Sequence, residues 1–218
     1  MPVHTFACPD LVARGLLKSY DDLPADRYLA GDHLYRYRAF GRTVLGPGPG
    51  EPHWSLGGPF FQSKHLNSHA GGMSRTFAPL ARAAQEFARA LALRALEQSL
   101  VPRGTYALGC HQIRVVARDG HPGLPTPEGF HRDGSSWVLI ACVARHNADG
   151  AITTVRRPAA PTQPLHEGRL AVGEALLLAD SVVEHHVSPL VPRRPGPAHR
   201  DVVVVTLAPA TAEEARDA

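Results

Sequence analysis

The run His131-Arg132-Asp133-Gly134 places an imidazole and a carboxylate two residues apart. On a β-strand, side chains at i and i+2 lie on the same face, so His131 and Asp133 could bind one metal ion. A second run, Glu184-His185-His186-Val187-Ser188-Pro189, offers an imidazole from a distant segment. Two histidines and one carboxylate leave three positions of an octahedron open. This pattern holds non-heme Fe(II) in oxygenases, where O2 and a co-substrate must reach the same metal.

Strand-like segments accompany both runs. Residues 136–144 are apolar and partly β-branched, which predicts a buried strand. Residues 169–179 are mostly apolar with a bend expected at Gly173-Glu174, and residues 201–207 predict another strand. The interval between the two runs has room for several strands. The sequence therefore predicts a mainly β fold with flanking helices, a double-stranded β-helix of the jelly-roll or cupin-like type.

Helices are expected in the N-terminal part of the chain. Residues 10–20 predict a short helix, and a helical stripe starts at Pro79, continues for about two dozen residues and stops at Pro102-Arg103-Gly104. The apolar residues of the stripe are Leu80, Ala84, Phe87, Leu91 and Ala95. The length suits a single domain over residues 1–218. We expect a helical and strand support region over about 1–100 and a jelly-roll catalytic core over about 105–208.

Composition excludes some classes of function. The net charge of +3 is small, and the pairs Arg156-Arg157 and Arg193-Arg194 are isolated, so we expect no nucleic-acid partner. No apolar segment reaches the ~20 residues of a membrane-spanning helix. The three cysteines lack CxxC spacing, which favours a reducing compartment. No basic region followed by an apolar stretch opens the chain, so we expect no secretion signal and a cytoplasmic protein.

Further motifs extend from about Tyr35 to Leu207. They are residues 126–134, Arg145-His146-Asn147, residues 185–189 and 200–207, and upstream Phe61-Gln62-Ser63, Asn67, Gly71-Gly72, Arg75 and His111-Gln112-Ile113-Arg114. Together they resemble the bacterial 2-oxoglutarate/Fe(II) dioxygenase family that includes the L-isoleucine hydroxylases. The motifs are specific jointly rather than singly.

The resemblance implies Fe(II) as cofactor, with 2-oxoglutarate and O2 as co-substrates. It implies His131, Asp133 and His185 as metal ligands and catalytic centre. Periodicity alone leaves His185 and His186 open, and the family-like pattern His-x-Val-Ser/Thr-Pro fits His185. The expected reaction hydroxylates an unactivated C–H bond of a small substrate, typically a free L-amino acid or an amino-acid-derived metabolite. Asp133 favours hydroxylation, since related halogenases leave that position small for a halide.

Other site residues follow from the resemblance and from strand periodicity. Arg200 is the candidate for the distal carboxylate of 2-oxoglutarate, because a guanidinium can bind a carboxylate through two hydrogen bonds. Arg193 and Arg194 are weaker alternatives. The candidate substrate contacts are Gln112, Arg114, Glu128 and Trp137.

Two other functions stay open at this point. A cupin-like metal enzyme could use the same ligands without 2-oxoglutarate, and a jelly-roll binding protein would have no catalysis. Arg200 discriminates between the metal enzymes, because only the 2-oxoglutarate-dependent hydroxylase requires a clamp for a distal carboxylate. The Pro/Gly-rich residues 46–52 and 158–164 are expected to be loops that either close over a substrate or connect elements at the surface. The amino acid, the stereochemistry and the oligomeric state are not determined by the sequence.

Overall fold

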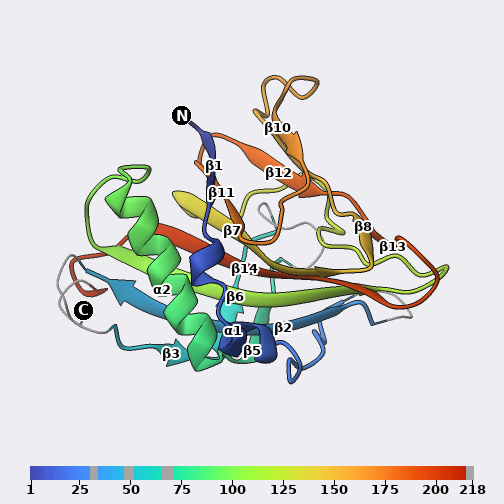
Figure 1. The fold of residues 1–218 in the computed structure, drawn as a ribbon. Coiled ribbons are helices and arrows are strands. Elements are labelled where there is room, and N and C mark those ends of the chain that lie inside the picture. Colours follow the sequence, from blue (N-terminus) through green and yellow to red (C-terminus); the bar gives the residue numbers. More distant parts are fainter. Residues whose placement is uncertain (30–33, 47–51, 65–70, 215–218) are drawn as a thin grey trace.

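The computed structural model describes residues 1–29, 34–46, 52–64 and 71–214. Its centre is a nine-stranded sheet in the order β1-β11-β7-β14-β6-β2-β5-β4, with β3 paired to β2 (Figure 1). These strands are β1 (Val3–Ala7), β2 (Arg36–Leu45), β3 (Ser55–Leu56), β4 (Gly58–Phe61), β5 (Ser74–Pro79), β6 (Tyr106–Ala117), β7 (Trp137–His146), β11 (Glu174–Leu178) and β14 (Ala198–Pro209). The pairs are antiparallel except for β2 and β5, which are parallel.

Two smaller sheets accompany the large one. The first has the order β10-β9-β12, and in the second β13 pairs with β8. Their strands are β8 (Ala148–Gly150), β9 (Thr153–Arg156), β10 (Pro164–Gly168), β12 (Glu184–Val187) and β13 (Leu190–Pro192). The strands predicted over 136–144 and 201–207 are present as β7 and β14. In the segment 169–179 only β11 is a strand, and it begins directly after the positive-φ Gly173.

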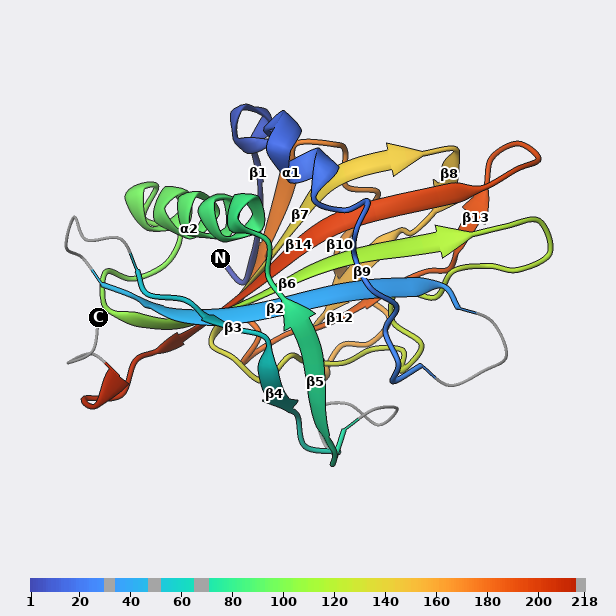
Figure 2. The same cartoon turned by 90° about the horizontal axis from the view of Figure 1, so that it is seen from below.

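The central strands of the large sheet, such as β7 and β11, are buried on both faces, because each alternates its side chains between two apolar layers. On β7, Leu139, Ala141 and Val143 pack in the cluster that includes the buried residues of α2 (Arg82–Glu97). Ile140 and Cys142 point the other way, toward Val155 of β9. Helix α2 thus covers one face, and the smaller sheets cover the other (Figures 1 and 2).

The second face carries two separate apolar clusters. One contains Ile140, Cys142 and Val155, and the other contains Val115, Val187 and neighbouring residues. The pocket described below is lined by Ile140 from the first cluster and Val187 from the second. The two apolar clusters therefore occupy two sides of the space between the large sheet and the small sheets. The polar pocket lies between these two clusters.

The helices differ in extent from the prediction. Residues 10–20 form a 3-10 turn (Pro9–Leu11) and a short helix, α1 (Arg14–Lys18), instead of one helix. The apolar stripe begins at Leu80, and all five of its residues are buried as expected. Helix α2 itself starts only at Arg82, because Pro79 still belongs to β5, where it pairs with Phe40.

The Pro/Gly-rich segments have different outcomes. Residues 47–51 lie outside the described part of the chain. Residues 158–163 form the turns between β9 and β10.

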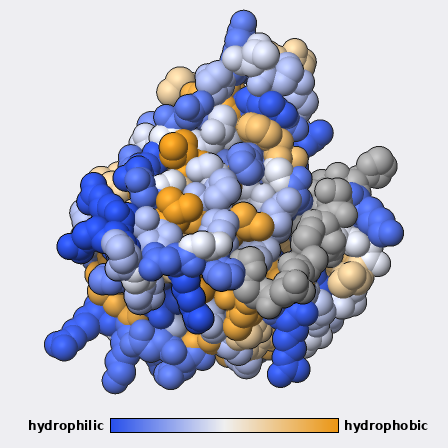
Figure 3. Space-filling view, turned by 90° about the vertical axis from the view of Figure 1, so that its right-hand side faces the viewer, coloured by the Kyte–Doolittle hydropathy of each residue, from blue (hydrophilic) through white to orange (hydrophobic). Residues whose placement is uncertain are grey.

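Figure 3 shows the face seen from the right of Figure 1, where hydrophobic patches are separated by hydrophilic residues. Within the described residues, no helix has the length and apolar character needed to cross a membrane.

Candidate metal centre and its pocket

The backbone joins the two histidine segments directly. His131 and His185 form an isolated antiparallel bridge, in which each N–H donates to the other carbonyl at 3.0 and 2.9 Å. Their ring centroids are consequently only 4.3 Å apart. Strand β12 of the smaller sheet thus places His185 beside His131, which lies in a loop far earlier in the sequence.

Asp133 completes the group. One of its oxygens lies 4.0 Å from His131 Nε2, and the other lies 3.8 Å from His185 Nε2. The three ligand atoms are all within 4.8 Å of one another. Two imidazoles and a carboxylate at this separation can approach one metal ion from one side and leave its other side open.

The protonation of the histidines suits metal binding. His131 Nδ1 lies 3.0 Å from the carbonyl of Gly129, so Nδ1 carries the proton and Nε2 is free to bind a metal. Burial lowers the pKa of His185 well below its usual value, and the nearby His131 and His186 lower it further. The neutral imidazole is the form that binds a metal.

His186 points away from this group. Its Nδ1 lies 2.9 Å from the hydroxyl of Thr126, and its ring packs against Phe130. The same hydroxyl accepts a hydrogen bond from the backbone N–H of Val187, so Thr126 holds this end of β12. The two adjacent histidines therefore face opposite sides, and the structure brings His185 to Asp133.

A buried carboxylate that sequence analysis did not identify holds the loop of Asp133. Asp180 accepts hydrogen bonds from the backbone N–H groups of Asp133, Gly134 and Ser135 at 3.0, 2.8 and 3.1 Å. Gly134 has φ +88°, which lets the chain turn around this carboxylate. Asp180 is 1 % exposed, and burial is the main cause that raises its pKa, against the three N–H donors. No metal-ligand spacing marks Asp180 in the sequence.

The triad lies in a pocket between the large sheet and β12. The lining includes polar side chains from seven segments of the chain: Arg36, Arg38, Gln62, Arg75, His111, Thr126, Glu128, His131, Asp133, His185 and Arg200. Its apolar wall is Ile113, Pro125, Ile140, Val187, Val202 and Val204. Among the predicted residues, the pocket thus brings together the triad, Arg200 and Glu128.

Arg200 is buried in this pocket, and none of the described carboxylates forms an ion pair with it. It is 2 % exposed, and its Nε and Nη2 atoms have no hydrogen-bond partner in the described chain. Burial lowers its pKa, and the neighbouring Cys142 acts in the opposite direction. Val202 and Val204 share its strand face and line the same pocket, so the guanidinium lies beside apolar side chains. A buried guanidinium in this state fits an anionic ligand that reaches it from the metal.

Three other predicted residues lie elsewhere. On β6, His111 and Ile113 face the pocket, so Gln112 and Arg114 face the opposite side of the sheet. Gln112 donates to the hydroxyl of Ser19, and Arg114 forms two hydrogen bonds with Asp201, both 2.8 Å. Trp137 packs against the cluster beneath α2. The structure does not bring these three side chains to the pocket.

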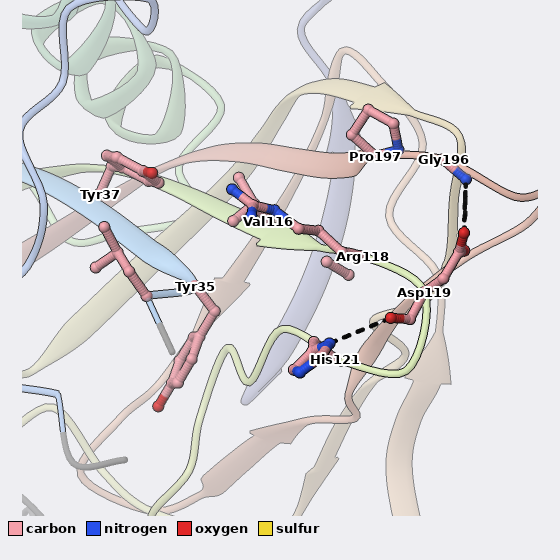
Figure 4. A pocket seen from close by; sticks show the side chains of 10 residues that line it. Tyr35, Tyr37, Val116, Arg118, Asp119, His121, Gly196 and Pro197 are labelled. Atoms are coloured by element: carbon pink, nitrogen blue, oxygen red, sulfur yellow. Dashed lines mark hydrogen bonds between the residues drawn. The ribbon is translucent and has the colours of Figure 1, made fainter. Parts of the chain in front are cut away.

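A second hollow lies at the far end of β6 (Figure 4). Tyr35, Arg118, His121 and Pro197 are among the residues that line it. Its loops are held by Asp119, whose side chain accepts from Gly196 N–H at 3.2 Å. The hollow shares no lining residue with the pocket of the triad.

Comparison with known proteins decides the family. The sequence model described as 2OG-Fe dioxygenase matches residues 17–206. The chain belongs to this family. A comparison with curated proteins gives no match. The family accounts for the triad and favours a 2-oxoglutarate-dependent enzyme over a cupin-like enzyme without 2-oxoglutarate and over a binding protein.

Solved structures show the fold of this dioxygenase. A bsmA homolog from Methylobium petroleophilum PM1 is 30% identical with a TM-score of 0.74, over 89% of this chain and 80% of that one. IDO from Bacillus thuringiensis is 21% identical with a TM-score of 0.69, over 93% and 84%. The Fe(II)/(alpha)ketoglutarate-dependent dioxygenase TqaL is 15% identical with a TM-score of 0.63, over 97% and 84%. The predicted double-stranded β-helix is confirmed.

The cofactors of this dioxygenase follow from its family. They are Fe(II), with 2-oxoglutarate and O2 as co-substrates, and the His-Asp-His triad offers the donor set that the iron requires. When bound, iron and 2-oxoglutarate supply the oxidising power for an otherwise unreactive substrate bond. The chain itself supplies a fixed ligand triad and an enclosed pocket around it.

Proposed function

We propose that this dioxygenase hydroxylates an unactivated C–H bond of a free L-amino acid or of a metabolite derived from one. The supporting observation is the mixed charge of the pocket lining. Guanidinium groups and the carboxylate of Glu128 line the same pocket as the triad, and Glu128 Oε1 lies 3.7 Å from His131 Nε2. Such a lining is complementary to a zwitterion, which carries one carboxylate and one ammonium group.

Each part of the pocket then has a role in the proposal. His131, Asp133 and His185 bind Fe(II), and the side chain of Arg200 binds the distal carboxylate of 2-oxoglutarate. Glu128 attracts the substrate ammonium group. The apolar residues Val202 and Val204 exclude water from the path between the metal and Arg200.

A substrate screen tests the proposal. The protein is incubated with Fe(II), ascorbate, 2-oxoglutarate and each free L-amino acid in turn, and succinate release and a mass gain of one oxygen are followed. We expect one or a few amino acids to give both signals, and Asp133→Ala to give neither. Succinate release without an oxygenated amino acid across the whole set would contradict the proposed substrate class while leaving the dioxygenase assignment intact.

A further inference from the structure

Two arginines that form no ion pair with any described residue lie in the same pocket as the triad. Arg38 comes from β2 and Arg75 from β5, and both line the pocket. Arg36 and Arg38 share one face of β2 because they are two residues apart. Arg75 is only 1 % exposed. Side chains of this size and charge are rarely so buried unless they are paired with an opposite charge.

Two phenyl rings hold both guanidinium groups in place. Arg38 Cζ lies 4.5 Å from the ring centroid of Phe77 and 5.6 Å from that of Phe60. Arg75 Cζ lies 5.0 Å from Phe60 and 5.8 Å from Phe77. Contact with aromatic faces orients a guanidinium but does not neutralise its charge. The pair is thus fixed in position and still cationic.

Charge compensation in this region is incomplete. Arg36 is paired with the buried Asp26 at 2.8 Å. In the part of the chain that the structure describes, no carboxylate lies within 4.0 Å of Arg38 or Arg75, and the buried Nε of Arg75 has no hydrogen-bond partner. Burial and the neighbouring Arg36 lower the pKa of Arg38 to about 9. An anion placed between the two guanidinium groups would offset the free-energy cost of burying their charges and would reduce the repulsion between them.

His111 orients Arg38 without adding a charge. Its Nδ1 accepts a hydrogen bond from Arg38 Nε at 3.1 Å. Burial, with Arg38 and Arg75 nearby, lowers the pKa of His111 well below its usual value, so the imidazole is neutral. The guanidinium group of Arg38 is therefore held in one orientation, and its terminal nitrogens can donate to another acceptor.

Gln62 connects Arg75 to the metal centre. Its Oε1 accepts from Arg75 Nη2 at 2.7 Å, and its Nε2 donates to the backbone carbonyl of Asp133 at 3.3 Å. A single side chain thus separates this guanidinium from a metal-ligand residue. A small molecule bound at Arg75 would therefore occupy the pocket that also holds the triad.

We propose that Arg38 and Arg75 together bind the carboxylate of the organic substrate and so restrict the enzyme to carboxylic acids. This inference rests on the proposed function and specifies which guanidinium groups recognise the acid. The carboxylate lies between the two forks, over the edges of Phe60 and Phe77. The remainder of the substrate extends toward Asp133.

The register of the sheet keeps this position apart from that of 2-oxoglutarate. Arg200 of β14 is paired with Val115 of β6, whereas Arg38 of β2 is paired with Ile113. The whole of β6 lies between the two arginine-bearing strands. The pocket therefore offers two distinct carboxylate positions, one for the co-substrate and one for the substrate.

Binding is measured on the anaerobic protein loaded with Fe(II) and 2-oxoglutarate, by calorimetric titration, so that recognition is separated from hydroxylation. The probes are the free L-amino acids and, in parallel, their carboxamides. We expect some acids to bind and their carboxamides to bind weakly. In Arg38→Gln and in Arg75→Gln the affinity for those acids falls about 30-fold or more, since one side of a buried charge pair is lost.

Further variants make the result specific. Arg75→Lys, which retains the charge without the fork, recovers part of the loss. Arg103→Gln changes an exposed arginine in a turn and binds acids as the unaltered protein does. Iron binding by Arg38→Gln and Arg75→Gln is measured alongside, because retained iron shows that the pocket is folded.

Three results would overturn the inference. The first is carboxamides that bind as tightly as the acids. The second is unchanged acid affinity in folded Arg38→Gln and Arg75→Gln. The third is a loss confined to 2-oxoglutarate in these variants. Acids that bind through the two arginines, with no amino acid hydroxylated, would support this inference and count against the proposed function alone.

Discussion

Replacing Arg200 with alanine isolates the contribution of one buried charge to co-substrate binding. In the structure this guanidinium is 2 % exposed, and two of its nitrogens have no partner among the described residues. If it binds the distal carboxylate of 2-oxoglutarate, the variant leaves that carboxylate buried without its counter-charge. Loss of one partner of a buried, hydrogen-bonded charge pair costs about 2–5 kcal/mol.

This free energy corresponds to a large change in affinity. Since about 1.4 kcal/mol is a factor of ten, the apparent affinity for 2-oxoglutarate should weaken by about 30-fold or more. Arg200→Lys should recover only part of the loss, because an ammonium group cannot form the two parallel hydrogen bonds of a guanidinium. The assay is succinate formation as a function of 2-oxoglutarate concentration at saturating iron.

The control is Arg193→Ala, which removes an exposed arginine of the β13–β14 connection and should leave the 2-oxoglutarate dependence unchanged. Iron binding should survive in Arg200→Ala, because the triad is untouched. An unaltered 2-oxoglutarate dependence in Arg200→Ala would refute the reasoning. A matching loss in Arg193→Ala would move the clamp to the loop arginines.

Two further predictions concern positioning and stability. Asp180→Asn keeps an acceptor but removes the charge that three N–H groups surround, and we expect iron affinity about 10–100-fold weaker with 2-oxoglutarate affinity of the iron-saturated enzyme retained. Metal titration checks this, and unchanged iron affinity would show that the loop of Asp133 is held without that charge. Leu91→Ala removes a fully buried side chain of α2 and should lower the free energy of unfolding by about 2–5 kcal/mol in urea denaturation, whereas a loss below 1 kcal/mol would mean that the cluster under α2 closes the gap.

The sequence allowed prediction of those site residues that belong to a spaced motif or lie on a strand with a clear pattern. On β14, two-residue periodicity puts Arg200, Val202 and Val204 on one strand face, and all three line the pocket. The same periodicity could not tell which face of β6 meets the pocket. Both faces of that strand are buried, so no alternation of polar and apolar residues marks the inner one.

Other parts of the site depend on tertiary structure alone. Asp180 follows a strand and carries no ligand spacing, and its role appears only when the loop of Asp133 folds over it. Arg38 and Arg75 meet because β2 and β5 pair in parallel, a contact that local pattern does not reveal. The division into a support region over about 1–100 and a catalytic core over about 105–208 stays a prediction.

The most direct test of the account is iron binding by a matched pair of neighbouring variants. His185→Ala removes an imidazole that faces Asp133, while His186→Ala removes one that faces Thr126. Anaerobic titration with Fe(II) should give one iron per chain in the unaltered protein and in His186→Ala, and none in His185→Ala. Loss of iron in His186→Ala with retention in His185→Ala would contradict the triad on which the account is built.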